Sequence, residues 1–311
     1  MNVRYRQIEA FRFVMITGTT VGAGDLMSIS QPAVSRLISD LEYSLKFKLF
    51  ERKKGRLVPT PEAVRFYQGV ERFYIGLDEL DHVAEQIRTQ KPSDLKICAM
   101  PALSTFVFPH AVRKFRADYP NVALRLESSS SSEIVSRLQT HLTQLGLTLA
   151  FPEVPGIVQE PLMEAPHVCA VHETHRLAKK EILRPADFEG EEVIDIMPSG
   201  LVNWNLTRNT LDKAGIKYQR HIGVQNSHTG YSLIAANLAI GLIEPFAAAA
   251  WLKNGVVVRR FEPQVMFRYV IAYSENQAEP ATMQAFVKYV REACGKLKDL
   301  TGVGTGIEEA D

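Results

Sequence analysis

The 311-residue sequence has few cysteines and no long apolar segment. Its three cysteines, Cys98, Cys169 and Cys294, are odd in number and far apart, which excludes a disulfide framework and a CxxC zinc site. No apolar run reaches the roughly 18–20 residues that a membrane span needs, and the N-terminus lacks the apolar stretch of a secretory signal. We therefore expect a protein of the reducing cytoplasm.

The sequence also lacks the motifs of the common enzyme classes. It contains no GxSxG, HExxH or Walker A motif, and Gly302, Gly304 and Gly306 do not lie between a strand and a helix. His172 and His175 have a spacing that suits a metal, but no third ligand accompanies them. We expect no enzymatic activity, no metal and no cofactor. An apolar fraction of 46% and a charged fraction of 23% indicate a globular chain of about two domains.

Basic residues are concentrated at the start of the chain. Residues 1–60 hold ten Lys/Arg and five Asp/Glu, a net charge of +5, whereas the remainder carries a net charge of −4. A small basic segment on a slightly acidic body favours contact with a polyanion through that segment alone. A chance fluctuation in a short window gives the same asymmetry, so charge alone leaves nucleic acid binding open.

Residues 1–60 have the pattern of a helix-turn-helix followed by a basic hairpin. Apolar periodicity predicts helices over 4–17 and 20–27, a turn at 28–30 and a third helix from Gln31. Ser30 suits an N-cap and Pro32 the first turn. Beyond the third helix, apolar residues flank a basic tip, the pattern of a β-ribbon wing over phosphates. We predict DNA contacts from eight residues: Gln31, Pro32, Ser35, Arg36, Arg52, Lys53, Lys54 and Arg56. The alternative for the basic tip is a solvated hairpin.

A heptad stripe occupies the next segment, residues 61–91. Its members are spaced alternately by four and three: Phe66, Val70, Phe73, Leu77, Leu80, Ala84 and Ile87. No proline interrupts residues 62–91, so a helix of about 30 residues is expected. The stripe favours a dimerising coiled coil over a long helix packed on its own domain.

Strands alternate with helices from residue 93 onward, which predicts a parallel sheet in an α/β fold. We expect strands at 95–100, 122–126, 146–151, 167–172, 192–197, 220–225, 239–243, 256–261 and 267–273. The expected helices are 106–119, 133–142, 200–213, 228–237 and 280–298, and the Gly-rich acidic tail 301–311 is expected to fray.

Four turns rich in hydroxyl residues follow strands in this region, at 101–105, 128–132, 198–201 and 226–229. In such folds ligands bind at the carboxyl ends of strands against helix N-termini, which favour a carboxylate. Plain N-capping is the alternative for any single turn. We predict that a small carboxylate effector contacts Ala102, Ser104, Thr105, Ser130, Phe151, Ser199, Gly200, His228 and Thr229.

Residues 1–60, called the head below, resemble the LysR-type transcriptional regulators. The similarity lies in Ser30-Gln31-Pro32-Ala33-Val34-Ser35-Arg36, then Ile38, Leu41-Glu42, Leu45, Leu49-Phe50 and Arg52. It departs from the family at Val21-Gly22-Ala23-Gly24, where an alanine-rich helix is usual, and at Lys46, where glycine is expected. Further matches, such as Ser227-His228-Thr229 and Glu244-Pro245, resemble the octopine and nopaline catabolism regulators of this family, although Gly146 replaces a usual acid.

The resemblance implies a division of the chain into DNA-binding and effector-binding parts. A winged helix-turn-helix would occupy residues 1–60, a dimerising linker helix 61–91, and an effector domain built like a periplasmic solute receptor 92–300. Its first lobe would comprise about 92–165 and 268–300, and its second about 166–267. The implied partners are double-stranded DNA, further copies of the chain in a homodimer or tetramer, an opine or amino acid, and RNA polymerase. The alternatives are an unrelated metabolite effector, a solute-binding protein or an enzyme.

Overall fold

A computed structural model describes residues 3–53, 56–89, 94–197, 205–275 and 281–295. The expected fraying of residues 301–311 and the start of the expected helix 200–213 fall outside the described residues. The chain divides into two compact units, Met1–Lys91 and Pro92–Asp311. No helix in the described part is both long enough and apolar enough to cross a membrane.

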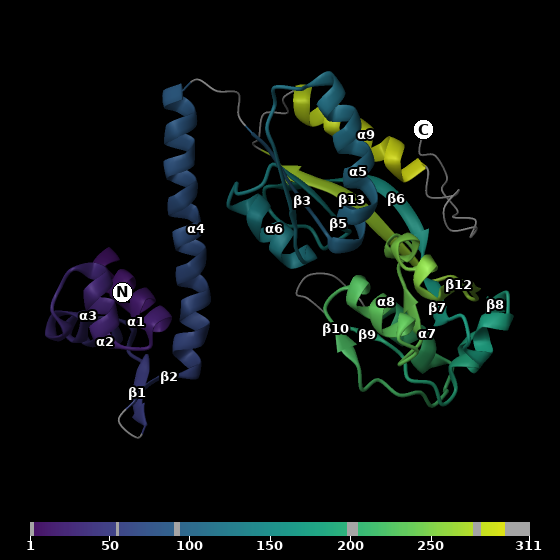
Figure 1. The fold of residues 1–311 in the computed structure, drawn as a ribbon, viewed down its shortest axis with the longest axis horizontal. Coiled ribbons are helices and arrows are strands. Elements are labelled where there is room, and N and C mark those ends of the chain that lie inside the picture. Colours follow the sequence, from purple (N-terminus) through teal and green to yellow (C-terminus); the bar gives the residue numbers. More distant parts are fainter. Residues whose placement is uncertain (1–2, 54–55, 90–93, 198–204, 276–280, 296–311) are drawn as a thin grey trace. The chain divides into compact units, whose positions relative to one another are not determined.

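The first unit is a winged helix-turn-helix followed by a long helix, as the sequence predicts (Figure 1). Its elements are α1 (Tyr5–Thr17), α2 (Thr20–Met27), α3 (Gln31–Leu45), β1 (Phe50–Lys53), β2 (Arg56–Pro59) and α4 (Pro61–Thr89). Strands β1 and β2 pair as an antiparallel hairpin. The predicted linker helix is continuous over 29 residues.

Phe11 organises the core of this unit. Its fully buried ring lies 5.8 Å from the Phe50 ring of β1 and 5.4 Å from the Phe66 ring of α4, measured between centroids. Burying an aromatic side chain of this size stabilises the fold by about 1.5–3 kcal/mol. One residue of α1 therefore holds the wing and the start of the long helix together.

The first half of α4 is also tied to α1 by polar contacts. Arg12 Nε lies 2.8 Å from Glu71 Oε1, and the Arg12 guanidinium lies 4.3 Å from the centroid of the Tyr74 ring. Two apolar side chains of the predicted stripe, Phe73 and Leu80, remain 44% and 64% exposed within the chain. The helix thus presents apolar surface that its own unit does not cover.

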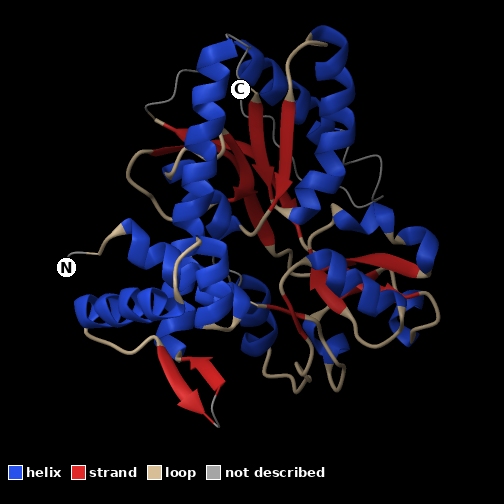
Figure 2. Cartoon of the chain, turned by 60° about the vertical axis from the view of Figure 1, so that its left-hand side comes forward, coloured by secondary structure: helices blue, strands red, loops and turns tan. Residues whose placement is uncertain are grey.

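Lobe I of the second unit is a five-stranded sheet in the order β4-β3-β5-β13-β6 (Figures 1 and 2). Helices α5 and α9 pack against each other, and α6 packs on β5 and β13. The bounds are β3 (Leu95–Ala99), α5 (Pro101–Asp118), β4 (Leu124–Ser128), α6 (Ser131–Gln139), β5 (Leu145–Leu149), β6 (Ile157–Pro166), β13 (Met266–Ser274) and α9 (Ala281–Gly295).

The sheet of lobe I is mixed, so the expected parallel pairing holds for β3 with β4 and β5 but not for β13. Strand β13 runs antiparallel to both β5 and β6. The chain leaves lobe I along β6 and returns along β13 from the same end, so these two strands must run in opposite directions. Strand β6 was not predicted from the sequence because it contains Pro161 and Pro166. As an edge strand with a bulge beside Pro161, β6 tolerates the missing N–H.

Lobe II is a four-stranded sheet in the order β11-β7-β12-β8, with a separate two-stranded pair, β9 and β10. Its bounds are β7 (Val168–His172), β8 (Ile182–Leu183), β9 (Asp195–Ile196), α7 (Asn205–Lys213), β10 (Gly223–Val224), α8 (Ser227–Ala235), β11 (Gly241–Ile243) and β12 (Val256–Phe261). Short 3-10 helices cover Arg176–Lys179, Pro185–Phe188, Ala247–Ala250 and Leu252–Asn254.

The two lobes are joined where β6 passes into β7 and β12 passes into β13. At this double crossover the backbone N–H of His167 donates a hydrogen bond to the carbonyl of Val265, at 2.9 Å. The two connecting segments are therefore held side by side. Any movement of one lobe relative to the other must therefore involve these two connecting segments.

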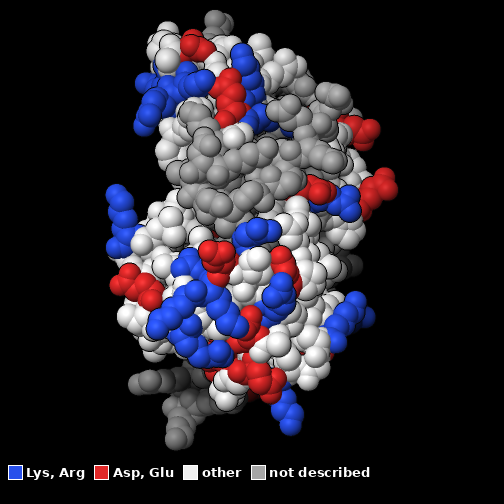
Figure 3. All heavy atoms as spheres, turned by 90° about the vertical axis from the view of Figure 1, so that its right-hand side faces the viewer, with Lys and Arg blue, Asp and Glu red and all other residues white. Residues whose placement is uncertain are grey.

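Charged side chains of both signs are interspersed on the face shown in Figure 3. The second unit contains several ion pairs between such side chains, including Arg176 with Glu191, Lys180 with Asp187 and Arg184 with Glu262. Exposed pairs of this kind contribute little to stability, about 0–1 kcal/mol each. The mixture of signs on this face is unlike the basic concentration in residues 1–60 of the sequence.

Candidate functional site

Helix α3 presents the polar side chains that are predicted to contact DNA. Gln31 Nε2 donates to Ser35 Oγ at 2.8 Å and to Thr20 Oγ1 of α2 at 3.1 Å. Pro32 and Arg36 are exposed on the same helix. Gln31 and Ser35 are thus neighbours on its surface, because residues four apart lie on one helical face, and the exposed Arg36 directly follows Ser35.

The glycine-rich α2 departs from the family pattern for a steric reason. A Cβ atom at Gly24 would lie 2.8 Å from the carbonyl oxygen of Ile29, in the turn between α2 and α3. The Ile29 N–H also bonds to the Gly24 carbonyl, at 3.0 Å.

Ser28 closes α2 in the left-handed region, with φ of 55°. Ser30 is the N-cap of α3, but its hydroxyl makes no capping hydrogen bond.

Glu42 connects the end of α3 to the wing. Its nearly buried carboxylate accepts hydrogen bonds from the N–H groups of Leu49, at 2.8 Å, and Phe50, at 3.2 Å. Lys48 Nζ lies 2.6 Å from the other carboxylate oxygen. Charge-assisted bonds of this type are roughly twice as strong as neutral ones, so Glu42 holds β1 against α3.

The predicted basic residues of the wing lie on the β1–β2 hairpin. Arg52 and Lys53 belong to β1 and pair with Leu57 and Arg56 of β2. Lys54 lies outside the described residues. The hairpin backbone therefore brings the predicted basic positions 52, 53 and 56 onto one two-stranded ribbon.

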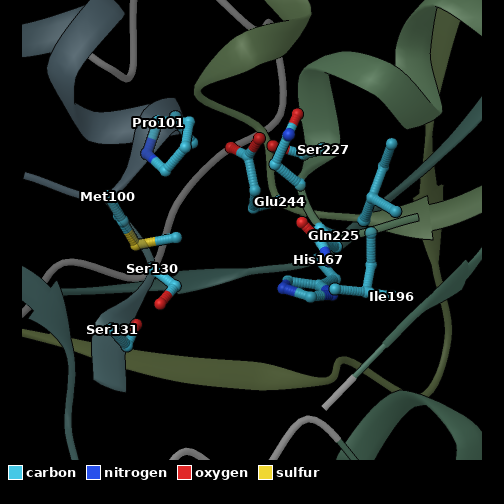
Figure 4. Close-up of a pocket in the computed structure, with 12 residues that line it drawn as sticks. Met100, Pro101, Ser130, Ser131, His167, Ile196, Gln225, Ser227 and Glu244 are labelled. Carbon is cyan, nitrogen blue, oxygen red and sulfur yellow. The ribbon is translucent and has the colours of Figure 1, made fainter. Parts of the chain in front are cut away.

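A pocket lies between the two lobes of the second unit (Figure 4). It contains about 440 Å³ of empty space, part of it open to solvent. Its lining includes residues at the starts of three helices: Met100, Pro101 and Ala102 at α5, Ser130 and Ser131 at α6, and Gln225, Asn226 and Ser227 at α8. Helix N-termini carry partial positive charge and unpaired N–H groups, so three of them together favour an anion.

Two buried polar groups in this lining have no partner among the described residues. They are the hydroxyl of Ser131, which is 2% exposed, and Nε2 of His167, which is 3% exposed. Figure 4 shows the His167 ring extending from lobe II toward Ser130 of lobe I. A buried polar group without a hydrogen bond costs about 1–3 kcal/mol, so a ligand that bonds to these groups would recover that energy.

Glu244 is the acidic group of the pocket. Its carboxyl accepts hydrogen bonds from the N–H groups of Phe246, at 2.5 Å, and Ala247, at 3.2 Å. Burial raises the pKa of Glu244 to about 7, and hydrogen bonds from Ser227, Ala247 and Phe246 partly offset that rise. Near neutral pH, Glu244 can therefore either donate a proton in a hydrogen bond or accept one from a cation.

The structure places only part of the predicted ligand set in this pocket. Ala102 and Ser130 line it. Ser104 and Thr105 lie inside α5, which begins at Pro101 rather than at the expected residue 106 because proline is well suited to the first helical position. The remaining predicted residues do not line the pocket or are not described: Phe151, His228 and Thr229 lie elsewhere, and Ser199 and Gly200 are outside the described residues.

Ser104 and Thr229, two of the predicted residues outside the lining, use their hydroxyls locally. Ser104 Oγ donates to the Pro101 carbonyl at 2.8 Å, and Thr229 Oγ1 lies 3.3 Å from Asn226 Oδ1. The buried Phe151 bonds through its backbone to Gln159. Local hydrogen bonding near a helix start, the alternative to ligand binding, therefore accounts for the hydroxyls of Ser104 and Thr229.

Sequence reasoning missed His167, Glu244 and most of the residues that immediately precede the helices. Glu244 directly follows β11 and His167 directly follows β6. The rule that sites lie at strand ends would have found Glu244 if it had been applied to acids as well as hydroxyls. His167 had no such signal, since β6 itself was not recognised.

The histidine pair considered for a metal serves two local turns. His172 Nδ1 lies 2.8 Å from Thr174 Oγ1, and His175 Nδ1 accepts a hydrogen bond from the Leu177 N–H at 3.3 Å. Within the ranges that the structure describes, no group of three or more His, Cys, Asp or Glu side chains is arranged to hold a metal ion.

Both units match sequence families. Residues 5–64 match the family described as "Bacterial regulatory helix-turn-helix protein, lysR family". Residues 88–295 match the "LysR substrate binding domain" family. The chain belongs to the LysR family of transcriptional regulators. Members of this family are regulators rather than enzymes, in agreement with the absence of catalytic motifs from the sequence.

Relatives of this LysR-family chain include two named regulators. It is 31% identical to the regulatory protein NocR of Agrobacterium fabrum over 284 residues. This alignment covers 91% of this chain and 94% of NocR. It is also 31% identical over 281 residues to the octopine catabolism/uptake operon regulatory protein OccR of Rhizobium meliloti, covering 90% and 93%.

The fold is also that of a solved LysR-family regulator. The crystal structure of full-length CbnR complexed with its target DNA superposes with a TM-score of 0.68 at 20% identity, covering 93% of this chain and 99% of CbnR. At this identity the likeness supports the fold. The expected combination of a winged helix-turn-helix, a long helix and a two-lobed effector domain is thereby confirmed.

Proposed function

We propose that this LysR-family regulator binds promoter DNA as a dimer or tetramer and responds to a small carboxylate effector, an amino acid or opine. The effector occupies the pocket between the lobes. The observation that carries this proposal is the convergence of the N-termini of α5, α6 and α8 on one pocket that contains the unpartnered Ser131 hydroxyl. An anion there meets backbone N–H groups and helix dipoles.

Glu244 favours an effector that also carries a cationic or hydrogen-bonding group. The pocket lining contains no lysine or arginine among the described residues, whereas Glu244 contributes a carboxyl group that can take a negative charge. A simple inorganic anion would be repelled by that charge above pH 7. An amino acid or opine places an ammonium or imino group next to its carboxylate and so matches both features. The relative named for octopine catabolism supports the same class.

On the DNA side, we propose that Gln31, Ser35 and Arg36 read base edges and that the wing residues contact phosphates. Exposure of Arg36 and the continuous polar face of α3 support this assignment. We further propose dimerisation through α4, because Phe73 and Leu80 leave apolar surface uncovered in the chain. Two heads on one dimer require two half-sites separated by whole turns of DNA. Contact with RNA polymerase would then follow at the promoter.

Isothermal titration calorimetry on the full chain tests the effector assignment. Octopine, nopaline and arginine are titrated into the wild type and into Ser131→Ala and Ser130→Ala. Ser136→Ala is the matched control, because Ser136 lies on the same helix but outside the pocket lining. At least one compound should bind. Ser131→Ala should weaken it about 10- to 150-fold, the loss of one buried hydrogen bond to a charged group at about 1.5–3 kcal/mol.

The outcomes separate the alternatives. Binding that is unchanged in both pocket variants would place the effector elsewhere. No heat from any of the three compounds would remove the opine and amino-acid class and favour a regulator with an unrelated metabolite effector. The family assignment and the DNA contacts would stand in either case, since they rest on other residues.

A further inference from the structure

A second pocket lies in lobe II, next to the interlobe pocket. It contains about 390 Å³ of empty space. Both pockets share His167 and Ile196 in their linings. The polar part of the second lining consists of His167, Asp195, Thr207, Arg208, Tyr218 and Arg220. We call this space the lobe II pocket.

Positive charge in the lobe II pocket is not balanced by its own acid. Arg208 bonds through one terminal nitrogen to both Asp195 oxygens, at 2.8 and 2.7 Å, which pairs those two groups. Arg220 has no acidic partner in the described part of the chain. Its guanidinium carbon lies 5.4 Å from the centroid of the Tyr218 ring, and the side chain is exposed. One cation therefore remains available to an anion.

Two buried nitrogens in the same lining lack hydrogen-bond partners among the described residues. They are Arg208 Nε and His167 Nε2. His167 is 3% exposed, its ring stacks on Phe267 at 3.8 Å between centroids, and its Nδ1 lies 3.2 Å from Thr207 Oγ1. The Arg208 Nε–H is a donor only. An acceptor atom in this pocket would satisfy a group that the protein leaves unsatisfied.

Burial keeps the His167 ring neutral. It lowers the pKa of His167 to about 3, and the nearby Leu242 carbonyl offsets that effect only in part. A neutral ring carries no charge that would hold an anion at His167 itself. It can bond through Nε2 to the uncharged middle of a molecule whose ends lie on either side.

We infer that the effector carries a second anionic group several bonds from the first, and that this group binds in the lobe II pocket at Arg220 and Arg208. The first carboxylate lies at the three helix N-termini, and the chain between the two passes His167 at the crossover. This inference rests on the proposed function and narrows its ligand class to elongated molecules with two separated anions.

Three compounds built on arginine test the inference. Arginine has a single carboxylate, octopine adds a second one close to the first, and nopaline adds a further carboxylate at the end of a longer arm. Calorimetry on the full chain compares the wild type with Arg220→Gln. Lys217→Gln is the matched control, because Lys217 is an exposed cation three residues away that does not line the pocket.

Nopaline should bind the wild type at least about tenfold more tightly than octopine. Arg220→Gln should abolish that preference while changing octopine affinity less than about twofold, and Lys217→Gln should change neither. Equal affinity of the three compounds, all weakened by Ser131→Ala, would overturn the second anionic site and leave the proposed function standing. If none of the three binds the wild type, both the proposed effector class and this inference are wrong.

Discussion

Thr105 Oγ1 lies 2.9 Å from His228 Nε2 and joins α5 of lobe I to α8 of lobe II. Trp251 Nε1 lies 3.4 Å from His228 Nδ1, and since the indole N–H only donates, Nδ1 accepts and the ring proton is on Nε2. Burial lowers the pKa of His228, partly offset by the Pro101 carbonyl. A neutral histidine therefore donates to a threonine across the lobes, near the helix starts that line the interlobe pocket.

A double-mutant cycle measures this contact between the lobes. Thr105→Val and His228→Leu each remove one partner with little change in volume. The coupling free energy from thermal or urea unfolding should be about 0.5–1.5 kcal/mol, the net value of one hydrogen bond. Thr210→Val serves as the control partner, because among the described residues its hydroxyl bonds only to the carbonyl of Leu206 on its own helix. Additive losses in the Thr105 cycle would show that the contact contributes nothing.

Glu244 should make the stability of the chain depend on pH. Its pKa is raised from 4.5 to about 7, so the folded state holds this proton more tightly than the unfolded state. The stabilising contribution is then complete below pH 4.5 and is lost as pH rises through 7. At about 1.4 kcal/mol per pKa unit, it amounts to at most about 3.5 kcal/mol.

The Glu244→Gln variant isolates that contribution. Wild-type stability relative to this variant should fall between pH 5 and pH 8 in denaturant unfolding. Glu153→Gln, at an exposed position, is the control and should follow the wild-type curve. Parallel curves for the wild type and Glu244→Gln would contradict the assignment.

Arg36→Ala should lose specific DNA binding without loss of folding. Arg36 is exposed on the polar face of α3, and one lost base contact costs about 1–3 kcal/mol. Gel-shift titrations would compare a DNA fragment selected by the wild type with unrelated DNA. The exposed Arg113 of α5 provides the control, Arg113→Ala. Unchanged specific affinity in Arg36→Ala would rule out a role in base reading.

Leu77→Asp combined with Leu80→Asp should shift the protein toward monomer. The two charges enter the apolar stripe of α4, where Leu80 is 64% exposed within the chain. Sedimentation velocity would report the mass, and operator binding should fall with it. Arg65→Asp with Gln68→Asp adds two acids to exposed positions outside the stripe as a control. A double Leu variant with wild-type mass would exclude dimerisation through this stripe.

Lys46→Gly should stabilise the first unit. Lys46 ends α3 with φ of 62°, a left-handed conformation that glycine adopts without steric cost. We expect a gain of about 0.5–1 kcal/mol, the relief of strain less the greater freedom of the unfolded chain. Lys46→Ala keeps the Cβ and should give no comparable gain. If the two variants melt together, strain at Lys46 is not the cause.

Gly146 shows why one departure from the family pattern could not be interpreted from sequence. A Cβ atom at this position of β5 would lie 2.6 Å from Ile134 Cγ2 and 3.0 Å from Leu138 Cδ1, both on α6. An acid there would require α6 to move or repack. The glycine therefore follows from how closely this helix packs on this strand, and neither residue's own sequence neighbourhood carries that information.

The sequence by itself determined those features of this protein that depend on residues close together in the chain. Periodicity, proline and glycine positions and the Ser30–Arg36 motif depend on neighbours within a few residues, so they predicted the head helices, the hairpin, α4 and most strands of both lobes. Only the tertiary structure decided the direction of β13, the edge position of β6 and the assembly of Ser131, His167 and Glu244 around one pocket. These depend on how far-separated segments pack, since a strand-end residue becomes part of a site only when another lobe closes over it.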